Sequence, residues 1–454
     1  MKLIYGVKDK PRFGALIVFA IQQLLAIMTA TLVVPVIING SCGTTMSSAA
    51  ALFGAGVGTL VYIAFTKRKS PVFLGSSFAF IGSMIAAFAG GVSMSLGFLG
   101  LIIGAAFAAL VYVVIAIIVK CAGVNWINKI MPAVVIGPTV AIIGLSLAGN
   151  AIGDMSKGSI EGIATSPLIT VLCGVVTLLI TVICSTYGKK TLRLIPFIMG
   201  ILGGYLVAAI FTAIGYAADI DAIKVLNVAP FLALVENGVN LNTFVSVPDF
   251  TFLTAFKGFG ELNAAYISTI AVAYIPVAFV VFAEHIADHK NISSIIEKDL
   301  LEEPGLHRTL LGDGIGSVVG AIFGGCPNTT YGESVGCVAI TRNASVVTII
   351  TAAILAILIS FISPFIAFVN SIPSCVMGGV CMALYGFIAV SGLKMVQTVN
   401  LNLNKNLFVV SVILIAGIGG LTLNFGKITI TSIACALILG IITNIVVSKA
   451  KEQE

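Results

Sequence analysis

The sequence predicts an all-α polytopic membrane protein with fourteen transmembrane segments, arranged as two inverted repeats of seven segments each. Three observations predict this class. The 454 residues are 59% hydrophobic and 9% charged, with a mean hydropathy of +1.14, whereas soluble domains carry about 25% charged residues. Apolar stretches of about 18–25 residues, the length of a membrane-spanning helix, recur along the chain. Two stretches are interrupted by polar residues, at corresponding positions in the two halves of the chain.

Most of the predicted segments are ordinary spanning helices, because each is apolar over the thickness of a bilayer. They cover residues 13–38, 47–65, 96–119, 131–148, 165–186, 195–217, 267–289, 309–325, 346–368, 373–392, 405–424 and 428–448. The first is too long for the core of a signal peptide and lacks a small-residue cleavage site, so we expect it to remain as a span. The nine cysteines show no metal-ligand spacing, and the sequence predicts neither a metal nor a cofactor.

The third and tenth segments are predicted to be broken, each with a short extended stretch. Residues 71–87 contain Gly75-Ser76-Ser77 in their middle, and residues 324–340 contain Pro327-Asn328-Thr329-Thr330. Non-helical backbone at membrane depth is tolerated only where it is buried in protein or lines a cavity. Interrupted segments at corresponding positions of two halves are typical of the substrate site of a transporter. An odd number of segments in each half makes the repeats inverted.

The charge distribution predicts that both termini lie in the cytoplasm. With this topology, only Lys157, Lys224, Lys257 and Lys427 of the 24 Lys and Arg fall on the outer side. Such an asymmetry is the positive-inside rule. The net charge of +6 is therefore explained by topology, and no nucleic-acid partner is predicted. The largest outer connection, residues 218–266, mixes polar and apolar pieces and is predicted to be partly structured.

Two glutamates lie at predicted membrane depth. Glu284 follows an apolar run from Ile267 to Ala283, and Glu333 lies in the broken tenth segment. A charged side chain at the bilayer centre costs about 2.5–3.5 kcal/mol on insertion scales, so it normally faces a cavity or a partner. Half-helices that begin near Phe78 and Gly332 would also offer unpaired backbone N–H groups. These donors and acceptors suit a small planar molecule with alternating C=O and N–H groups, such as a nucleobase.

The motifs around these residues resemble those of the nucleobase–ascorbate transporter family, and most closely those of its bacterial uracil permeases. The matching stretches are Leu74-Gly75-Ser76-Ser77-Phe78-Ala79-Phe80, Phe282-Ala283-Glu284-His285-Ile286, Lys298-Asp299-Leu300-Leu301 with the run from Glu303 to Arg308, Pro327-Asn328-Thr329-Thr330-Tyr331-Gly332-Glu333, and Gly336 with Ala339-Ile340-Thr341-Arg342. The resemblance covers essentially the whole chain. It implies proton-coupled uptake of a nucleobase across the cell membrane by alternating access.

The resemblance also implies a division into two domains and a homodimer. The core domain comprises residues 13–130 (segments 1–4) and 267–370 (segments 8–11), the gate domain comprises residues 131–217 (segments 5–7) and 371–449 (segments 12–14), and the connection 218–266 is extracellular or periplasmic. Carried over by motif, the side chains of Glu284 and Glu333 bind the base. The backbone N–H groups of Phe78 and Gly332 complete the site.

The sequence departs from the uracil permeases at three positions. Gln23 and Asp288 each replace a His, and Ser334 replaces an Asn. An Asp at position 288 is more typical of the xanthine branch, which leaves xanthine or another oxo-purine as the alternative substrate. Asp288 lies one helical turn after Glu284 on the same face. Two interpretations stay open: Asp288 is a proton relay, or it is a solvated residue at the end of the span. Gln23 is expected to form a hydrogen bond near the site.

Other interpretations stay open at this point. Glu284 could pair with Lys290, and Glu333 could cap a half-helix. An anion exchanger or a channel could share this architecture, but an exchanger would need a basic residue between the half-helices, where the sequence places none. No nucleophile–base pair or metal set accompanies the glutamates, so an enzyme is not predicted. For a transporter, we expect a carboxyl group at the site to hold a proton before the neutral base binds.

Overall fold

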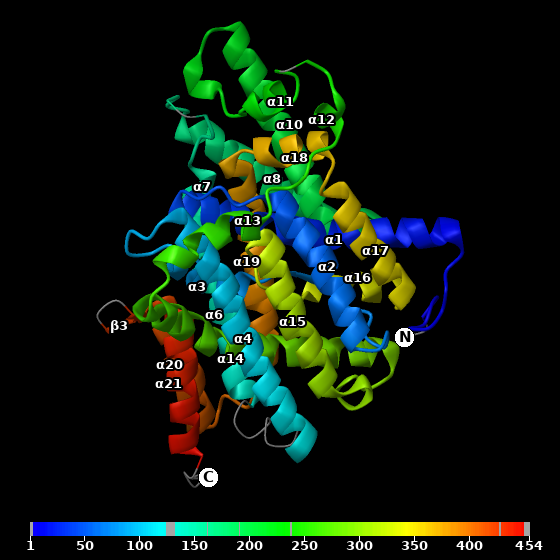
Figure 1. The fold of residues 1–454 in the computed structure, drawn as a ribbon, viewed down its shortest axis with the longest axis vertical. Coiled ribbons are helices and arrows are strands. Elements are labelled where there is room, and N and C mark those ends of the chain that lie inside the picture. Colours follow the sequence, from blue (N-terminus) through cyan, green and yellow to red (C-terminus); the bar gives the residue numbers. More distant parts are fainter. Residues whose placement is uncertain are drawn as a thin grey trace.

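The computed structural model describes residues 3–123, 132–160, 162–189, 191–236, 238–425 and 428–448. The predicted domain boundary between residues 130 and 131, and Lys427, lie outside these ranges. The described chain is mostly helical, and Figure 1 shows its helices gathered into one bundle with the connection between α10 and α13 at one end.

Within the described ranges, eight helical stretches are long and apolar enough to cross a membrane. They are α1 (Phe13–Cys42), α2 (Ser48–Phe65), α4 (Met94–Ala122), α6 with α7 (Ala133–Ser146 and Ala148–Met155), α8 (Pro167–Tyr187), α10 (Pro196–Ala217), α14 (Ala264–Ile296) and α19 (Ser374–Val396). Shorter apolar helices are η1 with α3 (Phe78–Phe80 and Ile81–Ala87), α17 (Val346–Ile359), α20 (Asn404–Ile418) and α21 (Ser432–Val447). These helices support the predicted class of a mostly helical, multi-pass membrane protein.

The remaining helices are more polar or very short. Two of them, α15 (Leu306–Gly324) and α16 (Gly332–Thr341), contain ionisable residues in their interiors or first turn. The others are α9 (Thr191–Leu194), η2 (Asp221–Ile223), α11 (Ala229–Ala233), α12 (Leu241–Phe244), α13 (Thr251–Ala255), η3 (Phe256–Glu261), η4 (Leu301–Gly305) and α18 (Ser363–Ser371). The short helices from η2 to η3 confirm that the long connection is partly structured.

Three predicted spans differ from the observed helices. The stretch 346–368 is not one helix: α17 ends at Ile359 and α18 begins at Ser363, because Pro364 starts a new helix more readily than it continues one. In the stretches 405–424 and 428–448, the end of the first and the start of the second form a β-hairpin and not helix. Strands β3 (Leu423–Phe425) and β4 (Ile428–Ile430) pair antiparallel there.

The two broken segments are confirmed, and they meet. Strand β1 (Leu74–Ser76) leads into η1 and α3, while β2 (Asn328–Thr330) leads into α16. The strands pair antiparallel, with Gly75 opposite Thr329. Since antiparallel strands run in opposite directions, the half-helices leave the pair in opposite directions. The backbone N–H of Ser77 extends this pairing by donating to the Pro327 carbonyl oxygen at 2.9 Å.

A seam of glycines sets the distance between α2 and α15. A Cβ atom on Gly54 would lie 2.8 Å from the carbonyl oxygen of Gly320, and one on Gly58 would lie 2.7 Å from that of Gly316. Such approach is closer than side chains allow and is typical of helix pairs in membranes. Asn328 anchors β2 to this seam, because its Nδ2 donates to the Gly54 carbonyl oxygen at 3.1 Å.

The helices pack in two sets. In the first set, α2 contacts α1, α15 and α17, and α4 contacts α14 and α15. In the second set, α19 contacts α6, α7, α8 and α10, and α20 contacts α6 and α21. Helix α14 of the first set also contacts α6, α21 and β4, and α1 contacts α10 and α19. The broken segments lie in the first set, close to where the two sets meet.

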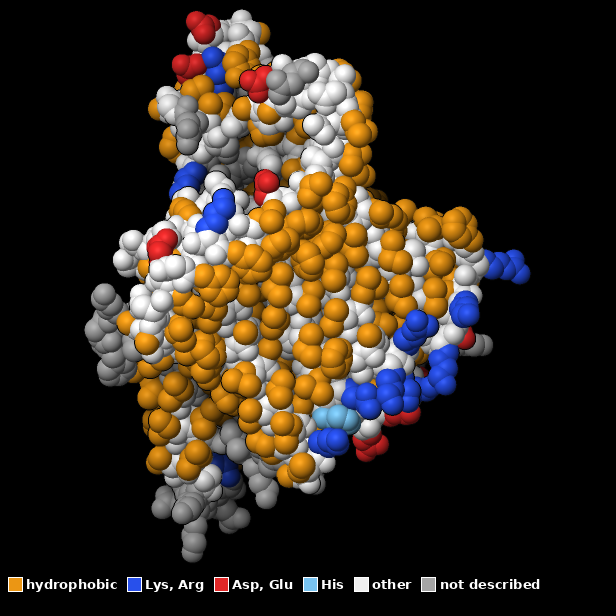
Figure 2. All heavy atoms as spheres, in the orientation of Figure 1, with side chains coloured by type: hydrophobic (Ala, Val, Ile, Leu, Met, Phe, Trp, Pro, Cys, Tyr) orange, Lys and Arg blue, Asp and Glu red, His pale blue; other side chains and the backbone are white. Residues whose placement is uncertain are grey.

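Charged and apolar side chains occupy different parts of the surface. Figure 2 shows a broad apolar area across the middle of the molecule and Lys and Arg side chains along one margin, near the start of the chain. Exposed basic residues at that end include Lys67 and Arg68 after α2, and Lys69 pairs there with Glu303 of η4. An apolar area of this breadth fits contact with lipid.

Candidate functional site

The two half-helices direct unpaired backbone donors toward one place. Phe78 and Gly332 are the first residues of η1 and α16, so their N–H groups have no acceptor within their own helix. Neither donates to another described group. The Tyr331 hydroxyl donates to the Ser76 carbonyl oxygen at 2.6 Å and holds the two breaks together. The partial positive charge of both helix starts therefore faces the same region.

Glu284 lies beside these helix starts. It is carried by α14, which packs against η1, β2 and α16. The side chain is half-buried, and it makes no hydrogen bond or ion pair with any described residue. Lys290 is exposed and does not pair with it, so the alternative of a Glu284–Lys290 ion pair is not formed. A carboxylate that is held at this depth without a partner is available for a ligand.

Glu333 is close enough to Glu284 for their charges to interact. It lies in the first turn of α16 and is also half-buried. Its carboxylate interacts with its own backbone N–H, which agrees with the favourable position of an acidic residue at a helix start. The remaining acceptor positions of both glutamates are free for a ligand in the described structure.

Asp288 borders the same space. Its Oδ2 accepts a hydrogen bond from the Thr330 hydroxyl at 3.0 Å. A Cβ atom on Gly332 would meet only Asp288 Oδ1, at 3.7 Å, so the space next to Gly332 is open and Asp288 forms its edge. Asp288 is only 7% exposed. The alternative that it is a solvated residue at the end of the span is therefore wrong.

Gln23 joins α1 to the tenth segment. Its side chain is 2% exposed, and Nε2 donates to the Ser334 hydroxyl oxygen. That oxygen also accepts from the Phe73 N–H at 3.0 Å. The predicted hydrogen bond of Gln23 is thus present, and its partner is the residue that follows Glu333. An amide side chain does not ionise near neutral pH, so Gln23 contributes a fixed hydrogen bond between α1 and α16.

Aromatic side chains complete the site, and one of them, Tyr385, is not singled out by the sequence. The ring of Phe78 packs edge-to-face on Tyr385 of α19, with 5.8 Å between ring centroids. This contact joins the two helix sets directly beside the broken segments. Tyr331 was visible within the tenth-segment motif, but Tyr385 lies in a uniformly apolar span and carries no sequence signal.

Two cavities lie apart from the glutamates. One of about 360 Å³ is lined by polar residues of the long connection and of α18, among them Asn240, Asn242 and Asn370. The other, of about 320 Å³, borders the end of α14 at Lys290 and Lys298. Neither is lined by Glu284 or Glu333. The candidate site is defined by its convergent donors and acceptors and not by the size of a pocket.

The comparisons with known proteins agree with this geometry. Residues 14–426 match the profile described as Permease family (Xan_ur_permease). The uracil permease of Bacillus subtilis (strain 168) is 36% identical over 462 residues, which cover 100% of this chain and 97% of that protein. The uracil permease of Bacillus caldolyticus is 37% identical over 449 residues, with 98% and 95% covered. The transmembrane domain of a cyanobacterium bicarbonate transporter, BicA, has a TM-score of 0.60 at 13% identity and covers 97% of this chain and 100% of that chain, a likeness in fold alone.

Proposed function

Because this chain belongs to the permease family, we propose that it is a secondary active transporter that takes up a nucleobase, uracil, across the cell membrane. The family match confirms the resemblance predicted from the motifs. Full-length relatives named uracil permease support uracil as the base. Glu333 supports the same choice, since purine transporters of the family that the motifs resemble tend to carry Gln at the corresponding position.

The observation that carries the proposal is the meeting of two carboxylates with two helix N-termini. Uracil has two ring N–H donors and two carbonyl acceptors in one plane. Glu284 and Glu333 accept from the N–H groups, while the backbone N–H groups of Phe78 and Gly332 donate to the carbonyl oxygens. Hydrogen bonds to charged groups are worth about 1.5–3 kcal/mol each, so these contacts account for selection of a base over an apolar molecule of the same size.

The same proposal includes the fourteen-segment topology. The fourteen segments are the eight long stretches, the four shorter apolar helices, α15, and β2 together with α16. The broken segments are then third and tenth, as two inverted repeats of seven require. The end that carries Lys67 to Lys69 faces the cytoplasm, since basic residues favour that side.

The domain division follows the two helix sets. The core domain, residues 13–130 and 267–370, contains the broken segments and Glu284. The gate domain, residues 131–217 and 371–449, contains α19 with Tyr385, and residues 218–266 connect the two. In alternating access, the contact between Phe78 and Tyr385 is broken and re-formed as one domain moves against the other. A homodimer, with lipid around its apolar surface, completes this proposal.

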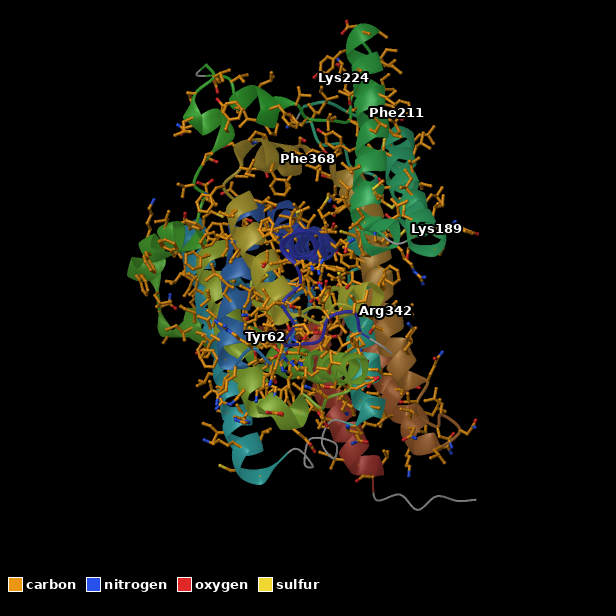
Figure 3. The ribbon with its side chains drawn as sticks, turned by 90° about the vertical axis from the view of Figure 1, so that its right-hand side faces the viewer. Tyr62, Lys189, Phe211, Lys224, Arg342 and Phe368 are labelled. Atoms are coloured by element: carbon orange, nitrogen blue, oxygen red, sulfur yellow. The ribbon has the colours of Figure 1, made fainter. Side chains whose placement is uncertain are left out.

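Anion exchange is a weaker candidate, although the fold neighbour BicA is a bicarbonate transporter. The described ionisable side chains beside the helix starts are Glu284, Asp288 and Glu333. Among described Lys and Arg, only Lys224 is buried, and it lies in the connection after α10, at the end of the molecule shown uppermost in Figure 3. Carboxylates at a helix start compensate the positive dipole and repel an anion.

Uptake of radiolabelled uracil by cells that express the protein tests the proposal. Concentrative uptake that an uncoupler abolishes is the expected result, with unlabelled uracil competing better than thymine, xanthine or hypoxanthine. Stronger competition by xanthine would transfer the proposal to an oxo-purine. Uptake of none of these bases would contradict it, and undiminished accumulation with an uncoupler would exclude proton coupling.

A further inference from the structure

A second polar cluster lies on the face of α14 adjacent to Glu284 and Asp288. His285 and His289 are one turn apart, both fully buried, and their rings stack with 4.0 Å between centroids. Asp313 of α15 meets His285, and Tyr62 of α2 meets His289. Figure 3 shows Tyr62 inside the bundle. Buried polar clusters are often retained at a cost in stability.

The hydrogen bonds of His289 fix it as a neutral ring. Its Nδ1 lies 2.7 Å from the His285 carbonyl oxygen, which can only accept, so Nδ1 carries a hydrogen. Its Nε2 lies 2.7 Å from the Tyr62 hydroxyl, which is itself 2.7 Å from the Ser70 hydroxyl. No described carboxylate lies within hydrogen-bonding distance of His289, so a charged ring there would be buried without a counter-ion.

His285 differs because its surroundings accept two protonation states. Its Nδ1 lies 2.7 Å from Asp313 Oδ2, and its Nε2 lies 3.0 Å from the Thr309 hydroxyl oxygen. The Thr309 hydroxyl also lies 3.0 Å from the Leu306 carbonyl oxygen. Its single hydrogen can point either to Leu306 or to His285 Nε2. This choice decides whether Nε2 acts as a donor or as an acceptor.

Each direction of the Thr309 hydroxyl corresponds to one charge of the cluster. When it donates to Nε2, the neutral His285 donates from Nδ1 to the Asp313 carboxylate, and the pair carries a net charge of −1. When it turns to Leu306, a proton binds at Nε2, an N–H bond forms there, and the pair becomes neutral. The hydrogen on Nδ1 then stays on His285 or moves to Asp313. Every hydrogen bond of His285 is satisfied in both states.

We propose that His285, Asp313 and Thr309 form the proton-binding site that couples proton movement to nucleobase transport. This inference rests on the proposed transport function. The unpartnered Asp313 Oδ1 supports it, since this buried oxygen has no hydrogen-bond partner among the described residues. A carboxylate buried in this way is costly, whereas a protonated carboxylic acid leaves only a carbonyl-type oxygen unpaired. The structure therefore favours a proton on the pair.

The cluster acts on the substrate site through charge. Asp313 interacts electrostatically with Glu284 and Asp288 across α14. When the pair is unprotonated, Asp313 adds a negative charge to those of Glu333 and Asp288 around Glu284, and repulsion disfavours an ionised Glu284. Protonation of the pair removes one of these charges, so Glu284 can stay ionised and accept the N–H of the base. Because such coupling is reciprocal, binding of the base also favours the proton on the pair.

The other titratable groups around the pair leave this assignment intact. Tyr112 of α4 lies edge-to-face with the His285 ring, with 6.3 Å between centroids, and its hydroxyl has no described partner. Tyr62 and His289 belong to the chain of bonds described above. From α16, Glu333 acts on Glu284, while Glu302 and Glu303 of η4 are exposed at the end of α15. Among these groups, His285 has the only direct contact with a carboxylate.

The test uses purified protein in liposomes and separates exchange from coupled transport. Uracil counterflow requires no net proton movement. Accumulation of uracil driven by a pH gradient does require it, and so does uracil-driven proton influx, which is measured with a pH-sensitive dye inside the liposomes. In Asp313→Asn the side chain is permanently neutral and keeps its bond to His285. We expect counterflow within about threefold of wild type, and accumulation and proton influx reduced by about tenfold or more. His285→Gln is expected to behave alike, while Ser317→Ala, one turn further along α15, should match wild type in all three.

The outcomes are distinguishable. Absence of uracil counterflow in the wild-type protein would contradict the proposed function itself. Wild-type counterflow together with normal proton influx in Asp313→Asn would overturn the inference about the cluster. Loss of counterflow in both variants, or failure of both to fold, would assign His285 and Asp313 a structural role and overturn it as well.

Discussion

Helix α14 presents two pairs of ionisable residues on adjacent faces, and the two pairs differ in their hydrogen-bond partners. Glu284 and Asp288 face the broken segments, where Glu284 has no partner and Asp288 borders open space. His285 and His289 face α2 and α15, which supply partners within about 3 Å for three of the four ring nitrogens. The fourth, Nδ1 of His289, bonds to the His285 carbonyl oxygen of α14 itself. Both pairs have the same spacing along the helix, so the difference lies in what the neighbouring helices supply.

The difference indicates how a membrane protein can separate binding from coupling. A polar group that lacks a protein partner at membrane depth is left for a ligand. A polar group that is fully bonded but can exchange one proton without losing a bond is suited to couple that ligand to a gradient. In the proposed alternating access, a single helix that carries both groups keeps the distance between them constant.

The largest effect is expected on the unpartnered face, at the carboxylate that α16 contributes. Glu333→Gln leaves one acceptor oxygen where the carboxylate has two, so either the N–H of the base or the backbone N–H of residue 333 faces an NH₂ group. Uracil uptake should fall by about a hundredfold, the equivalent of losing one charge-assisted hydrogen bond and leaving a donor unpaired. Initial rates of radiolabelled uptake measure it. Exposed Glu302→Gln on η4 is the matched control, and equal rates in the two variants would show that Glu333 does not bind the base.

The paired face depends on the seam between α2 and α15, so widening that seam is the next test. A Cβ atom on Gly58 would lie 2.7 Å from the Gly316 carbonyl oxygen. Gly58→Ala should destabilise the protein by about 1–3 kcal/mol through overpacking. Gly14→Ala, where a Cβ atom would meet nothing within 4 Å, should not destabilise it. Thermal unfolding in detergent compares the two variants. An unchanged unfolding temperature for Gly58→Ala would show that α2 and α15 can move apart without loss of stability.

A smaller effect is expected where a methyl group enters the open space without touching the protein. Gly332→Ala places a Cβ atom with only Asp288 Oδ1 nearby, at 3.7 Å. Stability should be unchanged, while the affinity for uracil should fall by about tenfold because the methyl group takes space needed by the base. Gly336→Ala, one turn further along α16 and also without neighbours within 4 Å, should bind as wild type. Equal affinities would place the base elsewhere.

The smallest effect concerns the ion pair between Lys69 and Glu303, next to the exposed Lys67 and Arg68. A hydrogen bond from Lys69 lowers the pKa of the exposed Glu303 carboxyl. A carboxyl with a lowered pKa in the folded state stabilises the fold above its unfolded pKa of about 4.3 and loses this contribution as the pH falls below it. Lys69→Gln should therefore lower the unfolding temperature slightly at neutral pH and not at acid pH. High salt should remove the difference, and a difference that grows toward acid pH would contradict this assignment.

The sequence predicted the parts of the site that are anomalies along the chain. A carboxylate after an apolar run and a Pro-Asn-Thr-Thr break within a span are visible without a structure. The sequence does not predict the His285–Asp313 pair, because the two residues are 28 positions apart on different helices. Asp313 is also a single acidic residue in a glycine-rich segment, without a motif that links it to His285. The β3–β4 hairpin was missed although Ile428-Thr429-Ile430 is β-branched, since the neighbouring apolar residues extend the helical pattern.

The role of Glu284 is tested by calorimetric titration of uracil into purified wild-type protein and Glu284→Gln, with the unfolding temperature of each protein measured alongside. Glu284 has no described partner, so its replacement leaves no protein group unpaired. We expect the variant to unfold as wild type does but to bind uracil about a hundredfold more weakly. Wild-type affinity in Glu284→Gln would show that this carboxylate does not bind the base.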